Sequence, residues 1–313
     1  MSFYMQEGGQ AAMVAWFVSL IPRVPANAYF PGLTDIWPTS EQVLSMMAGS
    51  EAEHAVLLAN YLTGLGRTAY LVLGRGVPEG RTAYVLTVEE NGHWLWNAVT
   101  GERFSTNETF LPLSAVHCVV SGSNMWANLQ AGDSPARLRW QLNSSTDWLP
   151  LFSSGAAAAA PPSLQPDRLT LSPADHRGAK QLKERIEKTL RNSLMNLRKK
   201  INMRTSLNFQ GKAVLAKLLP GLEAARLSPS PGRALGQEHL AELQRIMASH
   251  KLCGFPLHFA YSDLESIVEA VRGTGVHLCR EPGAEFALAV AVEPYPATAM
   301  SVWVYVASMV RRR

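Results

Sequence analysis

Hydrophobic and polar positions in the first half of the chain follow the period of a helix and then that of strands. Ser50 is followed three residues later by Glu53, the spacing of a helix capping box, and apolar residues then recur every three or four positions as far as Gly66. The next stretches are rich in β-branched and aromatic residues and bracket an Asn91-Gly92 turn. We therefore predict a helix that starts near residue 50, followed by strands at 68–73, 81–88 and 93–96.

The second half begins with a longer helical repeat. Its apolar residues recur every three or four positions and form one stripe bordered by Lys and Arg. The stripe consists of Leu182, Ile186, Leu190, Leu194, Leu197 and Ile201. Farther on, the spacing predicts two shorter helices, at 240–247 and 264–271, and two apolar strands, at 286–292 and 301–307. The pattern as a whole predicts an α+β protein with a basic amphipathic helix after its midpoint.

Two stretches without apolar periodicity divide the chain. Residues 153–162 contain Ser-Ser-Gly, five alanines and two prolines, and residues 228–232 read Ser-Pro-Ser-Pro-Gly. Both compositions are typical of linkers and turns. We predict a first domain over 1–150, an Ala/Pro/Ser-rich linker over 151–170, a basic helical segment over 171–227 and a C-terminal α+β segment over 228–313.

Composition indicates a folded protein rather than a disordered or membrane-spanning one. Hydrophobic residues make up 47% of the 313 residues and charged residues 17%, which is enough for a buried core. The apolar run 11–22 lacks the basic start of a signal peptide, and the run 299–310 is shorter than the roughly 20 residues of a membrane span. Three widely spaced cysteines and irregularly placed histidines predict a reducing compartment, no metal site and no cofactor.

Charge is distributed unequally along the chain. Residues 1–150 contain 7 Lys and Arg against 12 Asp and Glu, a net charge of −5, which leaves +9 for the remainder of a chain whose net charge is +4. This basic excess predicts binding to acidic tubulin tails or anionic lipid, although such a helix face can also be merely solvated. No nucleic-acid-binding motif accompanies it, so we expect no DNA or RNA partner. The predicted binding residues are Lys183, Arg191, Arg198, Lys199 and Lys200.

The order of elements in the first domain resembles the core of transglutaminase-like and papain-like thiol enzymes. Gly49-Ser50-Glu51 matches the glycine-x-cysteine that opens the catalytic helix of those enzymes. The strand that begins at Thr82 resembles the one that carries their catalytic histidine, and the strand that ends at Asn97 resembles the one that carries their catalytic aspartate. The resemblance therefore implies an α+β, transglutaminase-like fold whose three catalytic positions are Glu51, Thr82 and Asn97.

These residues cannot perform thiol chemistry. The reaction requires a thiolate and an imidazole, and Glu51 and Thr82 supply neither, whereas Asn97 alone could orient an imidazole. Removing a catalytic triad lowers the rate by about 10^4-fold to 10^6-fold. We therefore expect a non-catalytic protein. The alternative is a thiol-dependent hydrolase or transglutaminase that uses Cys118 with His117, His93 or His54.

Five longer strings resemble one family closely. They are 53–58 (EHAVLL), 80–86 (GRTAYVL), 254–258 (GFPLH), 285–290 (EFALAV) and 301–308 (SVWVYVAS). They are similar to the C-terminal region of the coiled-coil and C2 domain-containing protein 2 family, whose members 2A and 2B this sequence alone does not distinguish. The coiled coil and the C2 domain of full-length relatives are not in this sequence, so we expect a fragment or a short form.

Membership of this family implies a role in the cilium. We expect a non-catalytic scaffold or peptide-binding protein at the ciliary transition zone, at the base of the cilium, within the cytoplasm and cytoskeleton. There it would support cilium assembly and the barrier to membrane-protein diffusion between cilium and plasma membrane. The partners that the resemblance implies are subunits of the complex of tectonic, Meckel-syndrome and B9-domain proteins.

Overall fold

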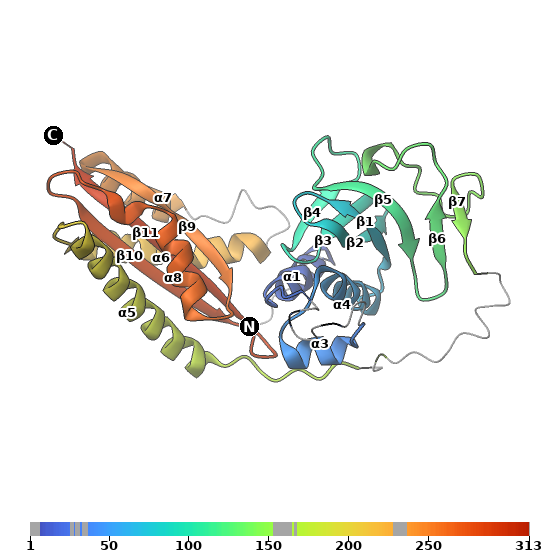
Figure 1. Ribbon diagram of the computed structural model, residues 1–313, viewed down its shortest axis with the longest axis horizontal. Coiled ribbons are helices and arrows are strands. Elements are labelled where there is room, and N and C mark those ends of the chain that lie inside the picture. Colours follow the sequence, from blue (N-terminus) through green and yellow to red (C-terminus); the bar gives the residue numbers. More distant parts are fainter. Residues whose placement is uncertain are drawn as a thin grey trace. The chain divides into compact units, whose positions relative to one another are not determined.

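The computed structural model describes residues 7–25, 28, 32, 37–152, 165, 168–227 and 237–312. The chain forms two compact units, Met1–Leu171 and Ser172–Arg313, each built around its own sheet (Figure 1). The predicted linker core at 153–162 and the Ser-Pro stretch at 228–232 lie outside the described residues. In the described part of the chain, no helix is both long enough and apolar enough to cross a membrane.

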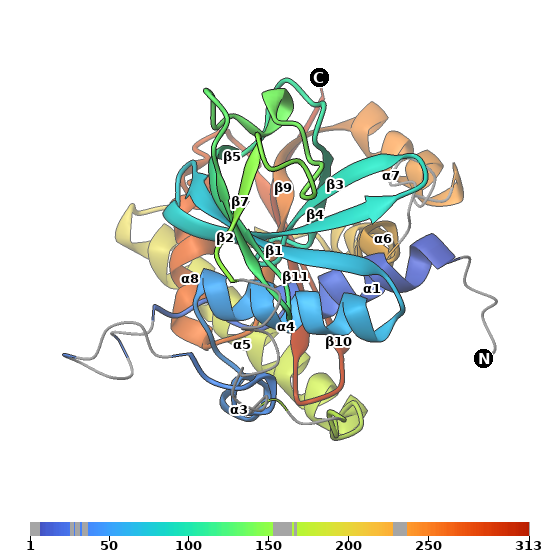
Figure 2. The ribbon, with the colours of Figure 1, turned by 90° about the vertical axis from the view of Figure 1, so that its right-hand side faces the viewer.

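The first unit packs helices on a seven-stranded antiparallel sheet. Helix α4 lies on β1 and β2, and α1 and α3 pack on α4; Figure 2 shows α4 crossing the strands. The order of strands in the sheet is β4-β3-β2-β1-β5-β6-β7. The helices are α1 (Glu7–Ser19), α3 (Ser40–Met46) and α4 (Glu51–Gly64), and the strands are β1 (Thr68–Gly76), β2 (Gly80–Glu89), β3 (Gly92–Asn97), β4 (Glu102–Ser105), β5 (Leu113–Val120), β6 (Met125–Asn128) and β7 (Trp148–Pro150).

The predicted helix and three strands of the first half are confirmed as α4, β1, β2 and β3. One face of their sheet carries Tyr84 and Leu86, which belong to the same buried cluster as the rings of Trp140 and Trp148. The loop 129–147, which contains Trp140, therefore closes this face of the sheet. At Gly74 the strands β1 and β5 approach so closely that a Cβ would lie 1.9 Å from the Ala115 carbonyl oxygen, and the register shifts there.

The second unit has helices on both faces of a four-stranded sheet. The order of strands is β8-β10-β11-β9, in which the short β8 runs parallel to β10 and the other neighbours are antiparallel. The helices are α5 (His176–Lys200), α6 (Phe209–Leu227), α7 (Gln237–Ser249) and α8 (Leu264–Gly273), and the strands are β8 (Ser206–Leu207), β9 (His250–Ala260), β10 (Glu285–Pro294) and β11 (Met300–Arg311).

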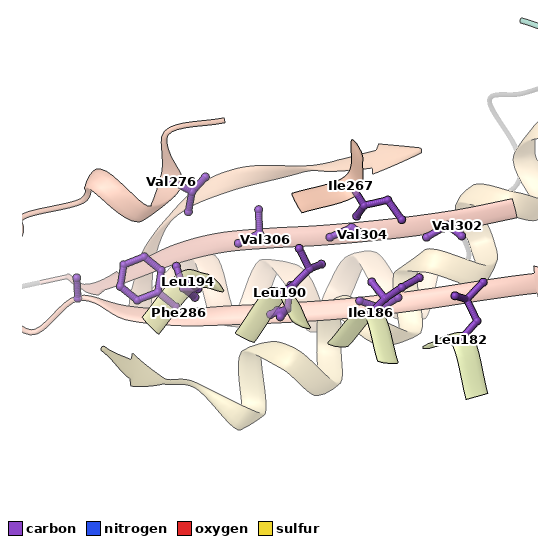
Figure 3. Close-up of a cluster of buried hydrophobic side chains, with 13 residues drawn as sticks. Leu182, Ile186, Leu190, Leu194, Ile267, Val276, Phe286, Val302, Val304 and Val306 are labelled. Carbon is purple, nitrogen blue, oxygen red and sulfur yellow. The ribbon is translucent and has the colours of Figure 1, made fainter. Parts of the chain in front are cut away.

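The apolar stripe of α5 forms the core of the second unit. Leu182, Ile186, Leu190 and Leu194 lie along β10 and β11, next to Phe286, Val302, Val304 and Val306, and Ile267 of α8 joins the same cluster (Figure 3). Residues on the opposite face of β11, including Ser301 and Trp303, instead contact Glu223 of α6. Alternation along β11 thus separates an α5–α8 layer from an α6 layer.

The predicted strands at 286–292 and 301–307 are confirmed as β10 and β11, and they form a sheet separate from that of the first unit. The predicted helices at 240–247 and 264–271 are α7 and α8. The helical segment that begins with α5 packs on β10, so it is part of the same compact unit as the C-terminal strands.

Candidate functional site

The position that resembles the catalytic cysteine of thiol enzymes lies at the start of α4. Ser50 is the N-cap, and its backbone N–H donates to the Glu53 carboxylate at 2.6 Å, which forms one half of a capping box. A Cβ at Gly49 would lie 2.9 Å from the same Glu53 carboxylate. The glycine two residues before Glu51 is therefore explained by the helix cap.

Glu51 is the first residue of α4, and its carboxylate is held by an arginine. The Nε of Arg23 donates to Glu51 Oε1 at 2.5 Å, and the side chain of Glu51 is only 15% exposed. The chain on either side of Arg23 runs along the start of the helix, because Val24 N–H donates to the Gly49 carbonyl at 2.8 Å. A carboxylate at a helix N-terminus also interacts favourably with the helix dipole. Glu51 therefore joins the segment before α3 to the start of α4.

Thr82 and Asn97 lie on neighbouring strands. Thr82 lies in β2, opposite Gly74 of β1, and Asn97 is the last residue of β3. Asn97 is only 5% exposed; its amide nitrogen donates to Tyr84 Oη at 2.9 Å, and its amide oxygen accepts from the backbone N–H groups of Val99 and Thr100. Asn97 thus closes the turn that leads into β4, and its hydrogen-bond partners in the described part of the chain include no imidazole.

At two of these three positions the structure gives the side chain a defined partner. The partner of Glu51 is Arg23, and the partners of Asn97 are Tyr84, a glutamate of the β1–β2 turn and the turn amides. Burial raises the pKa of the Tyr84 phenol, so it remains a neutral hydroxyl that accepts from Asn97. The side chains at the three positions offer a carboxylate, a hydroxyl and an amide, and none of these is a thiolate or an imidazole.

The alternative nucleophile, Cys118, has no histidine partner in the described part of the chain. It lies within β5, between Leu73 of β1 and Ala127 of β6, and not at a helix N-terminus. Burial raises the pKa of its thiol, which disfavours the reactive thiolate.

The three histidines named with Cys118 do not pair with its thiol among the described contacts. His117 is exposed, and by strand alternation it points away from the Cys118 thiol. His54 is fully buried, with its ring nitrogens 2.7 Å from the Ser50 carbonyl oxygen and 2.9 Å from that of Ile21. His93 stacks against Trp140, at 6.4 Å between ring centroids.

Four of the five basic residues predicted to bind an acidic partner are on the exposed surface of α5. Lys183, Arg191, Lys199 and Lys200 are exposed, whereas Arg198 is 1% exposed. The prediction for Arg198 is corrected by its surroundings, because its guanidinium faces the interior of the second unit and cannot present its charge to a partner.

Arg198 is instead a structural residue. It donates to the backbone carbonyl oxygens of Arg204, His277 and Cys279, at 2.7–3.2 Å, and its guanidinium lies 4.4 Å from the ring centroid of Phe286. Burial lowers its pKa. These bonds attach the end of α5 to two loops.

Sequence reasoning did not find a pocket in the first unit, on the sheet face that carries Tyr84. This aromatic pocket has a volume of about 440 Å³ and is lined mainly by Tyr70, Leu86, His93, Trp126, Trp140 and Leu142. These residues come from four strands and the loop 129–147, so no sequence period connects them. Among the described residues, no group of three or more His, Cys, Asp and Glu side chains could hold a metal ion.

Two protein-family profiles match the chain. Residues 35–151 match the CEP76 peptidase-like domain, and residues 175–311 match the C-terminal domain of centrosomal protein of 76 kDa. The peptidase-like description of the first match, together with the helices and sheets of the structure, confirms the predicted α+β fold class.

Three individual proteins resemble the chain. Human protein CC2D2B is 36% identical over 301 residues, which cover 96% of this chain and 20% of that protein. The Drosophila melanogaster coiled-coil and C2 domain-containing protein 2A is 27% identical over 296 residues, 94% of this chain and 22% of that protein. The calcium-bound structure of Legionella pneumophila LapG aligns with a TM-score of 0.33 at 11% identity, over 40% of this chain and 71% of LapG, and so low a score carries no argument.

The match to the two curated relatives extends over nearly the whole chain, which in turn spans about a fifth of their length. The resemblance predicted from the five sequence strings is confirmed by this similarity. Over nearly its whole length, the chain is similar to proteins of the coiled-coil and C2 domain-containing protein 2 family.

Proposed function

We propose that this chain is a non-catalytic, protein-binding part of the ciliary transition zone, which supports cilium assembly and the barrier to membrane-protein diffusion. The similarity to this family supports the ciliary assignment. The observation that carries the non-catalytic assignment is the Glu51–Arg23 ion pair, because the position that resembles the nucleophile is used to hold the start of α4. The proposed partners are subunits of the complex of tectonic, Meckel-syndrome and B9-domain proteins.

Enzyme assays test the non-catalytic part of the proposal. The purified chain is incubated with fluorogenic peptide substrates of thiol peptidases and with an amine-incorporation substrate of transglutaminases. We expect no turnover above that of a heat-denatured sample. Turnover that disappears in Glu51→Ala or in Cys118→Ala would contradict the proposal, since it would assign the activity to this chain. Cys253→Ala is the matched control, because Cys253 is exposed and lies in the other unit.

Proximity labelling in ciliated cells tests the location and the partners. The chain is fused to a labelling enzyme and compared with the same fusion lacking residues 1–150. We expect enrichment of transition-zone subunits with the full chain, and loss of part of this set without the first unit. Enrichment of the same proteins by an unfused labelling enzyme would contradict the assignment.

The exposed face of α5 favours a second binding role. Lys183, Arg191, Lys199 and Lys200 are exposed around a helix whose apolar stripe is buried, so their charges face solvent. We propose that they bind the acidic tails of tubulin, because clustered Lys and Arg attract polyanions. Charge reversal at these four residues should abolish retention on glutamylated tubulin peptides at low salt, and high salt should abolish it in the wild type. Salt-insensitive binding, or binding to anionic vesicles but not to the peptides, would contradict this role.

A further inference from the structure

The aromatic pocket of the first unit has a rigid corner made by two rings. Tyr70 of β1 and Trp126 of β6 meet edge to face, with ring centroids 6.2 Å apart and an angle of 84° between the ring planes. Both rings are only partly buried, and both line the pocket. Two flat surfaces at a right angle form a corner that accommodates a compact, apolar ring.

Trp140 also lines the pocket, and two further rings pack beside it. The ring of His93 stacks on it at 6.4 Å with a 24° angle, and that of Trp148 at 6.0 Å with a 29° angle. These neighbours leave little of the Trp140 side chain exposed, and its indole N–H is the polar group that it contributes.

The Trp140 indole N–H has no hydrogen-bond partner among the described residues, although the side chain is only 8% exposed. Other tryptophans in the protein are paired: the indole of Trp148 donates to the Arg139 carbonyl at 2.7 Å, and that of Trp96 donates to Thr87 Oγ1 at 3.0 Å. A buried donor without an acceptor is costly and rare. Because the Trp140 side chain lines the pocket, a ligand bound there can supply the missing acceptor once a neighbouring side chain moves aside.

The lining of the aromatic pocket, as far as the structure describes the chain, contains no Lys, Arg, Asp or Glu. Burial lowers the pKa of His93, so at neutral pH this residue is uncharged. The pocket thus offers aromatic and aliphatic surface together with N–H and O–H donors. The ligand that fits this chemistry is apolar, uncharged and rich in hydrogen-bond acceptors.

We infer that the aromatic pocket binds a proline-rich peptide segment in the extended polyproline conformation. Proline rings would fill the Tyr70–Trp126 corner, and a backbone carbonyl of the peptide would accept from Trp140 Nε1. Proline-rich segments have exposed carbonyls and lack many backbone N–H donors, and they bind to aromatic-lined grooves in this manner. The indole nitrogen is almost inaccessible to solvent in the free protein, so a side chain at the rim moves when the peptide enters; Leu142 and Asn143 lie on the same loop and are less buried than Trp140.

A methylated lysine or another quaternary ammonium group fits this pocket less well. Such cations bind to the open faces of aromatic rings and are favoured by nearby carboxylates, and the described lining of the pocket has no Asp or Glu. A cation also has no acceptor for the unpaired N–H. The inference deepens the proposed function by naming the class of partner that the first unit binds, and it rests on that proposal only in assuming that the bound peptide is not cleaved.

Calorimetric titration of the full chain with a decaproline peptide tests the inference. The control peptide carries alanine at alternate positions, and a third peptide carries trimethyl-lysine in a proline-free sequence. We expect saturable binding of decaproline and at least tenfold weaker binding of the other two. Equal binding of the alanine-containing peptide, preferential binding of the trimethyl-lysine peptide, or no binding of decaproline would overturn the inference.

Two variants locate the binding site. Trp140→Phe keeps an aromatic ring and removes the N–H, so affinity for decaproline should fall about fivefold to tenfold, which corresponds to one hydrogen bond. Trp126→Ala removes one wall of the corner and should weaken binding at least tenfold. Phe110→Ala is the matched control, because Phe110 is 89% exposed and does not line the pocket, and its affinity should equal that of the wild type.

An NMR measurement separates a direct contact from a general loss of folding. The indole ¹H–¹⁵N signal that disappears in Trp140→Phe is assigned to Trp140, and it should shift when decaproline is added to the wild type. A signal that stays unchanged at saturation would overturn the predicted hydrogen bond. Mass spectrometry of the recovered peptide tests the underlying proposal separately: a cleaved peptide contradicts the non-catalytic function, whereas an intact but unbound peptide contradicts only the inference.

Discussion

The two units of this protein treat their buried polar groups differently. In the second unit, the Glu223 carboxylate accepts hydrogen bonds from Tyr295, Ser301 and Trp303, and the Arg198 guanidinium donates to three backbone carbonyls. In the first unit, the buried indole of Trp140 has no acceptor among the described residues and borders a cavity. A buried polar group with a full set of partners stabilises the fold, whereas an unpaired one beside a cavity marks a place where a ligand can supply a hydrogen-bond partner.

The positions that resemble a catalytic triad belong to the first kind. Glu51 is paired with Arg23, and both ends of the Asn97 amide are hydrogen-bonded. Glu51 therefore joins the segment around Arg23 to the start of α4, and Asn97 closes a turn. In the first unit, the feature suited to binding a ligand is therefore the aromatic pocket.

The largest effect is expected from Glu223→Ala. The substitution leaves the Tyr295, Ser301 and Trp303 donors without their charged acceptor inside the protein, so the free energy of unfolding of the second unit should fall by about 3–5 kcal/mol. Urea denaturation followed by far-UV circular dichroism measures this. Glu269→Ala is the control, since its ion pair with Arg272 is exposed and is worth less than about 1 kcal/mol. Similar losses in the two variants would show that the Glu223 network is not structural.

Arg198→Ala should have the next largest effect. The variant leaves carbonyl oxygens of Arg204, His277 and Cys279 without this donor and removes the contact with Phe286, so we expect a loss of about 2–4 kcal/mol. The adjacent Lys199 is exposed, and Lys199→Ala should change stability by no more than about 0.5 kcal/mol. Thermal unfolding of both variants measures the contrast, and equal midpoints would contradict the burial of Arg198. Retention on acidic tubulin peptides should follow the opposite order, with Lys199→Ala the weaker binder.

The stability of the second unit should also depend on pH through His258. This imidazole lies 3.0 Å from Ser301 Oγ and against the Trp303 ring, with Glu223 and Arg226 nearby, and burial lowers its pKa to about 4 from the ordinary 6.5. The folded protein therefore keeps His258 neutral where the unfolded chain already binds a proton. The resulting stability is fully present above pH 6.5 and is lost as the pH falls to about 4, up to about 3 kcal/mol in total. His258→Gln should remove this part of the pH dependence, and an unchanged slope between pH 7 and about 4.5 would contradict it.

Periodicity predicted those elements whose burial follows a regular repeat. The helix α4, the strands β1–β3 and the apolar stripe of α5 are of this kind. Helix α6 lies within the helical segment predicted over 171–227, but its own bounds were not predicted; it contains Pro220 and has apolar residues around much of its circumference, so no single stripe marks it. Strand β9 has no clear strand pattern either, because it contains Gly254 and Pro256. Pro256 is tolerated because β9 is an edge strand.

The candidate site was only partly predictable, for a similar reason. Arg198 continues the four-residue repeat that runs from Leu182 to Leu194, so its spacing already placed it on the buried stripe, but its charge suggested the surface. Two of the carbonyls that satisfy its charge, those of His277 and Cys279, are about 80 residues away, and no local pattern reveals such a contact. The aromatic pocket depends in the same way on contacts between distant parts of the first unit.

The smallest expected effect is a difference in stability between two tryptophan variants of the first unit. Trp148→Phe and Trp140→Phe remove the same atoms from two stacked rings, but only the first breaks a hydrogen bond, the one from the indole to the Arg139 carbonyl. Without ligand, Trp148→Phe should therefore be more destabilising than Trp140→Phe by about 1 kcal/mol. Urea denaturation of both variants gives the difference. If the two variants lose equal stability, the Trp140 N–H has an acceptor in solution, such as a bound water, and needs none from a ligand. If Trp140→Phe loses less, the N–H is unpaired in the free protein and destabilises it, and the peptide removes this destabilisation when it binds.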